Sequence, residues 1–542
     1  MRKSAIVLIA LLTALTACKK TDKDPWLLTL DDAKKMYPIT LCAKDFGAIP
    51  DDGKDDAKAL RDALAEAKTK NKGVRIVLGK GKYDMLSFDN GGAVPVTEAK
   101  NVMIDGDGAV IVHHQMRRQF LVCKSENITF ANLTFDADEI PFAGAEVTAV
   151  GDRYFDCEVI PPHVVKEVHP KAIITFDTEH DSMGKRGVDN YQMDTKLVIQ
   201  KLSDTTMRVP LEKHSKLPEV GSTVIVRYEV YGPGVITMSF AKDVRVYNTT
   251  INSHPGMGIH GSNTENILID GLQVVSKAKD LFMSATADAT HFNYCRGRID
   301  ILNSTFEKMG DDATNVHQMY WLFDEKQSPE KFTVVWGKKR GHANMPVDML
   351  PRVGDMIGFG AQDNWLRLAC FAKVKAVEPD MKAQQAVIVL ETPLPDYVGK
   401  GMPMANMSSD PVLTVKNCQV RGNRGRGFLI EVSKATVENC SFERTSLPAI
   451  LFENDANYWY EGFRTQDIQI SNCTFKDVNF WGARKDGVAI LDAAAFSKGM
   501  PDKGLVNGTT VVENCTFTGC GTDPIMLTQT QNPIIKNNAM KP

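Results

Sequence analysis

Short alternating stretches of apolar and polar residues run along most of the chain, and several share one phrase. Residues 437–442 (Val-Glu-Asn-Cys-Ser-Phe) recur as 470–475 (Ile-Ser-Asn-Cys-Thr-Phe) and as 512–517 (Val-Glu-Asn-Cys-Thr-Phe). Each copy predicts a short β-strand that bends at an Asn or Gly, because these residues tolerate a left-handed backbone conformation. Weaker copies lie at residues 130–135, 246–251, 269–274 and 301–306.

The spacing of these bends predicts a parallel β-helix. Asn417 and Asn439 are 22 residues apart, and Asn248 and Gly271 are 23 apart. That is about the length of one coil of such a solenoid. Two other intervals, of 32 and 33 residues, fit one coil with an added loop. We therefore expect an all-β fold built around a parallel β-helix.

Two intervals between bends are much longer and predict inserted subdomains. Asn132 and Asn248 are 116 residues apart, and Asn303 and Asn417 are 114 apart. After one coil is subtracted, roughly 90 residues remain in each interval. Both contain alternating apolar strands, for example residues 223–228 and 386–390. We expect each insert to form a small antiparallel β-barrel.

An amphipathic helix precedes the first coils. Leu60, Ala63, Leu64 and Ala67 recur at helical spacing and give the segment one apolar face. Asp55 or Asp56 can cap the start of this helix. We expect the helix to cover the open end of the solenoid and to shield the edge of the first coil.

The first 18 residues resemble the signal sequence of a bacterial lipoprotein. Arg2 and Lys3 precede an apolar run over residues 5–15 that is too short to span a membrane. Residues 15–18 (Leu-Thr-Ala-Cys) match a lipobox, which implies cleavage before Cys18 and lipidation of its thiol. The alternative is a plain secretory peptide in which Cys18 is incidental. Because acyl chains anchor without spanning, we expect a lipid-anchored protein of the bacterial cell envelope, periplasmic or on the outer-membrane surface.

These patterns combine into one plan of the chain. A signal peptide (1–18) and a tether (19–40) precede the N-terminal coils with their cap (41–137). The central coils, which carry the candidate site, occupy 233–321, and the C-terminal coils occupy 412–542. The first barrel fills residues 138–232 and the second fills 322–411.

Composition and charge exclude several classes of protein. The 542 residues are 43% hydrophobic and 24% charged, as in ordinary globular proteins. The net charge of −3 gives no indication of a nucleic-acid partner. Eleven cysteines are too few for a disulfide scaffold, and the absence of a Cys-x-x-Cys pair argues against zinc. Four of them follow the repeat asparagines and are predicted to be small core residues.

Stacking places residues one coil apart in sequence about 4.8 Å apart in space. Asp288 precedes Asp311 by 23 residues, and Glu431 precedes Glu453 by 22. Asp311 and Asp312 both reach the same face only if the chain bends there, which Gly310 permits. With the upstream His260, these residues predict a column of acidic and histidine side chains along one face.

Such a column can perform glycoside hydrolysis. Carboxylates on neighbouring coils would lie about 5–9 Å apart, which covers both glycosidase geometries, and crowding raises the pKa of one of them to supply the acid. Two other interpretations remain open. The aspartates are ordinary turn residues, or they bind calcium as in a polysaccharide lyase, with Arg296 or Arg298 as the base.

At these residues the sequence resembles glycoside hydrolase family 110, the bacterial α-1,3-galactosidases. The motifs are residues 287–292 (Ala-Asp-Ala-Thr-His-Phe) and 310–317 (Gly-Asp-Asp-Ala-Thr-Asn-Val-His), supported by 457–462 and, less specifically, by 45–53. The resemblance implies a right-handed β-helix with two small barrels. It also implies an exo-acting, inverting enzyme without a metal or other cofactor, which removes terminal α-1,3-linked galactose from glycans such as the blood group B antigen.

The resemblance also suggests roles for individual residues. Asp288 would be the general acid, and Asp311 and Asp312 would activate the attacking water, with the division between them left open. Trp459 would either stack on a sugar or pack a loop. From their place in the column, the candidate substrate-binding residues are His260, Asn315, His317, Glu431 and Glu453.

The remaining alternatives are another β-helix polysaccharide hydrolase or lyase, and a non-catalytic glycan-binding lipoprotein. The acidic column argues against an acidic substrate, which would require a basic groove. The expected partners are a glycan with terminal α-1,3-galactose, the membrane that holds the lipid and a second copy in a homodimer. Nucleic acid is not expected.

Overall fold

The computed structural model describes residues 24–542 except 90, 185, 186, 194, 195, 336–348, 463 and 483. The signal sequence and Cys18 lie outside the described residues, so lipidation and the envelope location stay predictions. Within the described part, no helix is long and apolar enough to cross a membrane.

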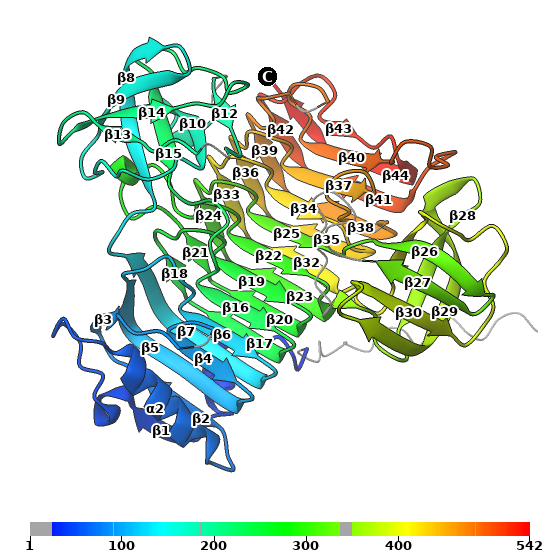
Figure 1. Ribbon diagram of the computed structural model, residues 1–542, viewed down its shortest axis with the longest axis horizontal. Helices are drawn as coiled ribbons and strands as arrows, with labels where there is room; N and C mark the ends of the chain where they lie inside the picture. The colour runs from blue at the N-terminus through cyan, green and yellow to red at the C-terminus, as the bar shows by residue number, and fades with distance from the viewer. Residues whose placement is uncertain are drawn as a thin grey trace, which may run out of the picture.

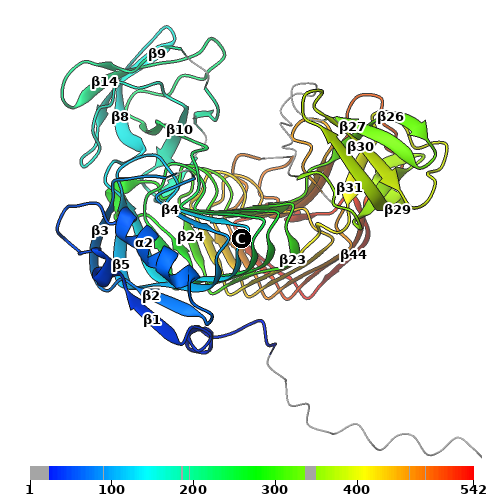
Figure 2. The ribbon, with the colours of Figure 1, turned by 60° about the horizontal axis from the view of Figure 1, so that its bottom comes forward.

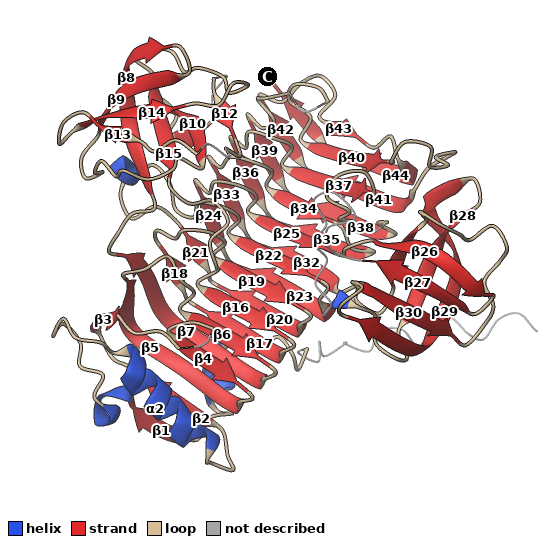
Figure 3. Ribbon diagram, viewed as in Figure 1, coloured by secondary structure: helices blue, strands red, loops and turns tan. Residues whose placement is uncertain are grey.

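The chain winds into a parallel β-helix in which each complete coil contributes three strands (Figures 1 and 3). One face is a ten-stranded parallel sheet, and it carries the candidate site. Its strands, in order, are β4 (Val94–Thr97), β6 (Phe120–Cys123), β16 (Ile236–Ser239), β19 (Ile259–Ser262), β22 (Thr290–Asn293), β25 (Thr314–His317), β34 (Phe428–Ile430), β37 (Ile450–Asp455), β40 (Ile490–Ala495) and β43 (Ile525–Met526).

The other two faces join into one 21-stranded sheet, because the long strands β5 and β7 bend across both. The first row contains β1 (Ile39–Cys42), β2 (Val74–Val77), β5 (Lys100–His113), β7 (Glu126–Ala137), β17 (Lys242–Tyr247), β20 (Glu265–Asp270), β23 (Arg296–Leu302), β32 (Val412–Lys416), β35 (Lys434–Glu438), β38 (Asp467–Ser471), β41 (Asn507–Glu513) and β44 (Thr530–Lys536). The second row adds β3 (Gly81–Met85), β18 (Thr250–Ile251), β21 (Gln273–Val274), β24 (Thr305–Glu307), β33 (Gln419–Arg421), β36 (Ser441–Glu443), β39 (Thr474–Lys476), β42 (Thr516–Thr518) and β45 (Ala539–Lys541).

The repeat asparagines make the bend between these two rows, as predicted. Their φ angles lie between 44° and 57°, in the left-handed region, and Gly271 has a φ of 77°. Their side chains also bond from coil to coil: Asn417 Nδ2 donates to Asn303 Oδ1 at 2.9 Å, and Asn303 Nδ2 donates to Asp270 Oδ1 at 2.7 Å. The sequence period therefore marks a real corner of the solenoid.

The apolar half of the repeat fills the interior. Phe442, Phe475 and Phe517 stack with ring centroids 5.0 and 4.8 Å apart and nearly parallel planes. The cysteines of the repeat are buried beside them as free thiols, which confirms that they are core residues. Aligned side chains on successive coils thus give the solenoid one continuous core.

The second insert is a closed antiparallel barrel that follows β25, as predicted. Its strands, in barrel order, are β26 (Trp321–Ser328), β27 (Lys331–Val335), β30 (Gln385–Leu390), β29 (Asn364–Asp380), β28 (Met356–Ala361) and β31 (Pro403–Asn406). Its core is separate from that of the helix and includes the stacked rings of Phe323 and Phe332.

The first insert differs from the predicted barrel, because its strands form an open curved sheet among the described residues. The sheet path ends at β11 (Ser182–Met183) and β13 (Gln200–Lys201), which do not pair. Both end strands have only two residues, too few to continue the hydrogen-bond ladder around a barrel. The other strands are β8 (Phe142–Gly151), β9 (Tyr154–Val159), β10 (Ala172–Asp177), β12 (Asp189–Asn190), β14 (Thr206–Pro210) and β15 (Thr223–Arg227).

The two inserts leave the coils at opposite edges of the ten-stranded sheet. The first insert lies between β7 and β16, so the chain passes from this insert into the ten-stranded sheet. The second insert lies between β25 and β32, so the chain enters this insert as it leaves the ten-stranded sheet. Figure 2 shows them rising on the two sides of the coil stack. The face between them is thereby walled on both sides.

The predicted capping helix is α2 (Ala57–Lys68), and its apolar face packs into the core at the N-terminal end of the solenoid. Asp56 precedes it, but its carboxylate instead accepts from the amides of Ile49 and Asp84 at 3.0 and 2.8 Å. Asp55 accepts from the Ala57 amide at 3.2 Å. The remaining short helices are α1 (Leu30–Lys34), η1 (Ala43–Phe46) and η2 (Lys279–Leu281).

The phenylalanine stack gives the first testable prediction. Phe475→Ala should lower the free energy of unfolding by about 3–5 kcal/mol, because it opens a cavity between two parallel rings. Phe475→Leu is the matched control and should cost less than about 1.5 kcal/mol. Urea unfolding followed by tryptophan fluorescence measures both. Equal losses for the two variants would contradict the cavity as the cause of the loss.

Candidate active site

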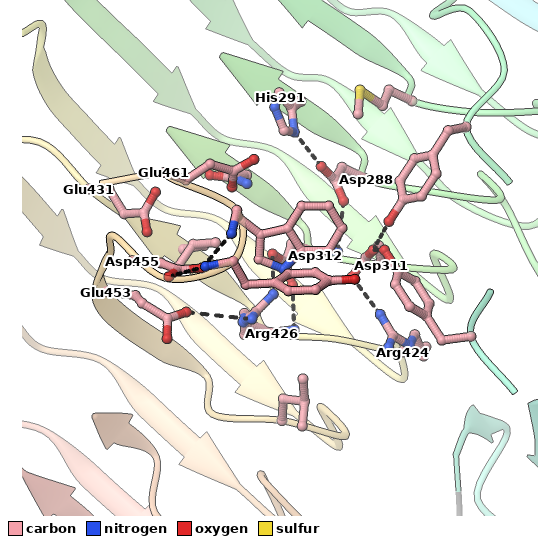
Figure 4. A pocket seen from close by; sticks show the side chains of 18 of the residues that line it. Asp288, His291, Asp311, Asp312, Arg424, Arg426, Glu431, Glu453, Asp455 and Glu461 are labelled. Atoms are coloured by element: carbon pink, nitrogen blue, oxygen red, sulfur yellow. Dashed lines mark hydrogen bonds and ion pairs between the residues drawn. The ribbon is translucent and has the colours of Figure 1, made fainter. Parts of the chain in front are cut away.

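A pocket of about 540 Å³ opens on the ten-stranded sheet, and the predicted aspartates line it (Figure 4). The coils before β22, β25 and β34 form its floor. Tyr191 and Tyr231, contributed by the first insert and the segment after it, stand on one side, and Tyr458 and Trp459 from the loop after β37 stand on the other. The site is therefore assembled from several consecutive coils and the first insert.

Strand register places Asp288 beside Asp312, one residue away from the predicted pairing with Asp311. Thr290 pairs with Thr314, so the coil repeat here is 24 residues and not 23. The backbone amide of Asp312 accordingly donates to Asp288 Oδ1 at 3.1 Å. The next coil continues the register, because Thr314 pairs with Phe428 and Asp312 is thereby followed by Arg426.

Both vicinal aspartates reach the pocket because the chain bends before β25, as predicted. A Cβ on Gly310 would lie 2.3 Å from the Thr286 carbonyl and 2.7 Å from Arg227 Nη1, so the bend requires a glycine. The buried Arg227 holds this bend to the preceding coil by donating to the carbonyls of Thr286 and Gly310 at 2.8 and 3.0 Å.

Asp311 is surrounded by three side-chain hydrogen-bond donors. Arg424 Nη1 donates to Oδ1 at 2.8 Å, and the hydroxyls of Tyr191 and Tyr231 donate to Oδ2 at 2.7 and 3.1 Å. Arg424 is itself fixed by Asp189 at 3.2 Å and by the ring of Tyr191, 3.8 Å from its guanidinium carbon. The first insert thus orients one catalytic candidate directly.

Asp312 is held by Arg426 alone among its described side-chain neighbours. The Arg426 amide donates to Oδ1 at 2.6 Å, and its Nη1 donates to Oδ2 at 3.2 Å. Burial raises the pKa of Asp312 to about 8, while Arg426 opposes this shift and Asp311 adds to it. Arg426 also lies 3.8 Å from Glu453, so it links the aspartates to the opposite wall.

Asp288 is favoured in its protonated form. Only 4% of the residue is exposed, and this burial raises its pKa well above the ordinary value, with a further contribution from the charge of Asp311. Its Oδ2 lies 2.6 Å from His291 Nδ1. A carboxyl group that keeps its proton in the pocket is the requirement for a general acid.

The opposite side of the pocket carries Glu431, Glu453, Asp455 and Glu461 (Figure 4). Burial raises the pKa of Glu431 well above its ordinary value, and the charges of Glu461 and Glu453 raise it further. Glu431 Oε2 and Asn315 Oδ1 are buried without a hydrogen-bond partner in the described structure. These acceptors suit the hydroxyl groups of a bound sugar.

An aromatic loop covers this acidic side. The Asp455 carboxylate accepts from the amides of Asn457, Tyr458 and Trp459 at 2.6, 2.9 and 2.7 Å, which fixes the loop over the pocket. The side chains of Tyr458 and Trp459 remain 44% and 37% exposed. An exposed ring at the pocket favours stacking on a sugar over packing of the loop, and this role stays a prediction.

The structure brings six of the eight predicted pocket residues together and moves two out of it. Asp288, Asp311, Asp312, Asn315, Glu431 and Glu453 line the pocket, and their individual roles stay predictions. His260 and His317 do not. Both contact His291, which lines the pocket: the ring centroids of His260 and His291 are 5.6 Å apart, and His317 Nε2 lies 2.9 Å from His291 Nε2.

The prediction missed several residues that shape the site. Arg424 and Arg426 flank Gly425 more than 110 residues after the aspartates that they bind. The predicted coil spacing places this coil next to the aspartates, but it does not identify the two arginine side chains. Tyr191 and Tyr231 belong to no repeat, so no periodic signal could have found them.

The basic residues suggested for a lyase are engaged elsewhere. Arg296 binds Asp355 with two bonds of 2.8 and 2.7 Å, and Arg298 binds Asp300 and Asp24. Neither lines the pocket. The positive charge beside the aspartates comes instead from the two arginines, so these carboxylates have cationic partners without a metal, and the metal-free mechanism stays a prediction.

The buried acids give a second testable prediction. Because the folded-state pKa of Asp312 is about 8 and an unfolded Asp titrates near 3.9, its contribution to the free energy of unfolding is present below pH 4 and is lost as the pH rises to about 8. In wild type, this titration should lower the free energy of unfolding by up to about 1.4 kcal/mol per pH unit over this range. Asp312→Asn should lack this part of the decline. Thermal unfolding from pH 4 to 9 measures it, with exposed Asp467→Asn as the control. Parallel curves for wild type and Asp312→Asn would contradict the shift.

Comparison with known proteins agrees with this architecture. A family model described as a right-handed beta helix region matches residues 398–500. The match with the family 28 exopolygalacturonase of Yersinia enterocolitica covers 93% of this chain and 75% of that enzyme's chain, at 10% identity and a TM-score of 0.41. At that score the likeness carries no inference.

Two curated relatives cover most of the chain. Alpha-1,3-galactosidase A of Shewanella woodyi is 27% identical over 482 residues, which are 82% of this chain and 77% of the relative. Alpha-1,3-galactosidase B of Phocaeicola vulgatus is 26% identical over 488 residues, 80% of this chain and 77% of the relative. The predicted resemblance is confirmed: the chain is a glycoside hydrolase and a homologue of proteins named α-1,3-galactosidases, consistent with glycoside hydrolase family 110.

Proposed function

We propose that the protein is an exo-acting α-1,3-galactosidase that removes terminal α-1,3-linked galactose from glycans such as the blood group B antigen, with inversion at the anomeric carbon. The observation that carries the proposal is the pairing, in one pocket, of a protonated Asp288 with the arginine-bound Asp311 and Asp312. The names of the curated relatives support the choice of linkage and sugar.

The pocket supports action at chain ends. Tyr191 and Tyr231 bound it on one side, and Tyr458 and Trp459 bound it on the other, so its lining surrounds a volume of about 540 Å³. A terminal sugar fits such a site better than the interior of a polysaccharide chain. The unpartnered acceptors on Glu431 and Asn315 would bind its hydroxyl groups.

Asp288 would protonate the oxygen that leaves as the glycosidic bond breaks. The anomeric carbon then carries developing positive charge, and the carboxylates of the pocket stabilise that charge. Asp311 or Asp312 would take a proton from the attacking water. Asp311 already accepts three hydrogen bonds from side chains, whereas the bonds to Asp312 come only from Arg426. Asp312 therefore has more lone pairs free to position the water. Its pKa of about 8 keeps a proton on it at neutral pH, so it can take the water's proton only after losing its own.

The spacing of the aspartates does not carry the choice of stereochemistry. Their nearest oxygens lie within 4.8 Å of one another, and carboxyl groups in this range by themselves fit the separation of about 5–5.5 Å in retaining enzymes. We propose inversion from the resemblance of residues 287–292 and 310–317 to the motifs of glycoside hydrolase family 110.

The direct test is proton NMR of the products released from a B-antigen oligosaccharide and from a linear α-1,3-galactoside. Early appearance of β-galactose is the expected result. Early appearance of α-galactose would support the proposed substrate but contradict inversion and the proposed roles of Asp311 and Asp312. Release of no galactose by the folded protein would overturn the proposed activity and favour glycan binding without turnover.

Asp288→Asn tests the role of Asp288 as the general acid independently of the other residues of the site. We expect kcat on an α-1,3-linked disaccharide to fall by about 10²–10⁴, the usual contribution of a positioned general acid. With α-galactosyl fluoride, whose leaving group needs much less protonation, the loss should be much smaller. Initial rates on both substrates measure the difference. Equal losses on both would show that Asp288 does not act as the acid.

A further inference from the structure

The pocket is longer than the terminal galactose that the proposed reaction removes. Its lining residues on the solenoid come from five consecutive coils, those of β19, β22, β25, β34 and β37. Neighbouring coils are about 4.8 Å apart, so the steps from β19 to β37 span about 19 Å. Its volume of about 540 Å³ lies in the range that encloses drug-sized ligands, which are larger than one hexose. The pocket therefore has room for a second sugar.

Asp288 marks the point from which that second sugar extends. The acceptors proposed for galactose, on Asn315 and Glu431, come from the coils of β25 and β34, and Glu453 lies one coil further along. Asp288 precedes β22, one coil before Asn315, and Figure 4 shows it and Glu453 on opposite sides of Asp312. The oxygen that Asp288 would protonate joins galactose to the leaving sugar. The leaving sugar therefore lies on the side of Asp288 that faces β19.

Three uncharged side chains line the pocket at that end, and we call them the uncharged platform. Met257 lies in the turn before β19, and Tyr231 lies in the segment that follows the first insert. Tyr231 is 44% exposed, and its hydroxyl donates to Asp311 at 3.1 Å, which orients the ring. Gln192, an exposed residue of the first insert, adds an amide. The platform thus contrasts with the acidic galactose end of the pocket.

Close backbone packing holds the platform in place. Residues 231–234 (Tyr-Gly-Pro-Gly) lie against residues 255–258 (Pro-Gly-Met-Gly). A Cβ on Gly232 would lie 1.7 Å from the Pro255 carbonyl oxygen, and a Cβ on Gly256 would lie 2.1 Å from the Gly232 carbonyl oxygen. The two segments approach each other this closely because both positions are glycines. The tyrosine and the methionine of the platform are therefore presented side by side on tightly packed backbone.

We propose that the uncharged platform binds the leaving sugar, the residue to which the terminal galactose is attached. The apolar face of a pyranose packs on the Tyr231 ring and the Met257 side chain, and the Gln192 amide bonds one of its hydroxyl groups. A neutral sugar is favoured over an acidic one, because a charge buried here would have no partner on the platform. The inference rests on the proposed hydrolysis, since only cleavage of a glycosidic bond produces a leaving sugar.

The first insert then acts on both halves of the substrate. Tyr191 donates to Asp311 at 2.7 Å, next to the bond that breaks, and Gln192 follows it directly in the chain. One short segment of the insert, after β12, therefore contributes to catalysis through Tyr191 and to the choice of leaving sugar through Gln192.

Met257→Ala tests the platform on two substrates. An α-1,3-linked galactose disaccharide carries a leaving sugar, whereas α-galactosyl fluoride carries none. We expect kcat/KM for the disaccharide to fall roughly 3–10-fold, because the lost side chain would cover part of one sugar. For α-galactosyl fluoride, kcat/KM should remain within about twofold, and so should the inhibition constant of free galactose, because both depend on the galactose end alone. Equal losses on both substrates, or no loss on either, would overturn the proposal.

Met381→Ala is the matched control. Met381 lies in the hairpin between β29 and β30 of the second insert, is 60% exposed and does not line the pocket. Its replacement should leave kcat/KM for both substrates unchanged. A loss on the disaccharide equal to that of Met257→Ala would show that the effect does not come from the platform.

Two variants of Tyr231 separate its ring from its hydroxyl. Tyr231→Phe keeps the ring and loses the bond to Asp311, so it should lower kcat/KM for the disaccharide and for α-galactosyl fluoride alike, because both reactions need the activated water. Tyr231→Ala should add a further loss that is confined to the disaccharide. The ratio of kcat/KM between the two substrates measures this difference. The same ratio in Tyr231→Phe and Tyr231→Ala would contradict the binding of the leaving sugar by the ring.

A measurement on wild type keeps the proposal testable if Met257→Ala does not fold. Methyl α-galactoside presents the same galactose and an alkoxide leaving group, but no leaving sugar. Its kcat/KM should be at least roughly tenfold lower than that of the disaccharide, because binding energy from the leaving sugar is lost. Equal values would overturn the proposal. If wild type releases galactose from neither the disaccharide nor α-galactosyl fluoride, the proposed function itself has failed, and the two failures are thereby distinguished.

Discussion

The pocket depends on the pairing of three buried aspartates with two arginines. A buried carboxylate without a partner costs several kcal/mol, and Asp288, Asp311 and Asp312 meet within one small volume. Arg424 and Arg426 supply the compensating charge from the next coil. A Cβ on the intervening Gly425, whose φ is 102°, would lie 2.8 Å from Asp312 Oδ1, so a glycine lets the arginine turn approach the carboxylates. The coil register must therefore be accurate for the site to exist.

The solenoid provides that accuracy, and the inserts preserve it. The second barrel separates Asp312 from Arg426 by 114 residues, yet β25 and β34 pair directly as neighbouring strands. The barrel has its own core and so does not disturb the stack. The first insert takes part in the pocket, because Tyr191 bonds to Asp311 and Arg227 holds the bend that precedes Asp311. One insert is thus a structural part of the pocket.

Burial of the carboxyl groups costs folding free energy, and it also raises the pKa values on which the proposed chemistry depends. Asp288 and Asp312 both prefer protons more strongly than exposed aspartates do, whereas Asp311 accepts bonds from three side-chain donors. Differences of environment over a few ångströms therefore separate acid from base. The histidines beside Asp288 extend the hydrogen bonding inward, since His291 contacts His317, which bonds to the carbonyl of Gln318.

The sequence by itself determined the solenoid, the two insertion points, the capping helix and most of the pocket floor. It could do so because a coil of constant length puts residues such as Asn417 and Asn439, or Glu431 and Glu453, in line. The tertiary structure decided the 24-residue register at Asp288 and the arginines that bind the aspartates. It also decided the open sheet of the first insert and the separation of His260 and His317 from the pocket. These features depend on strand pairing across inserts and on the direction of single side chains, and neither leaves a period in the sequence.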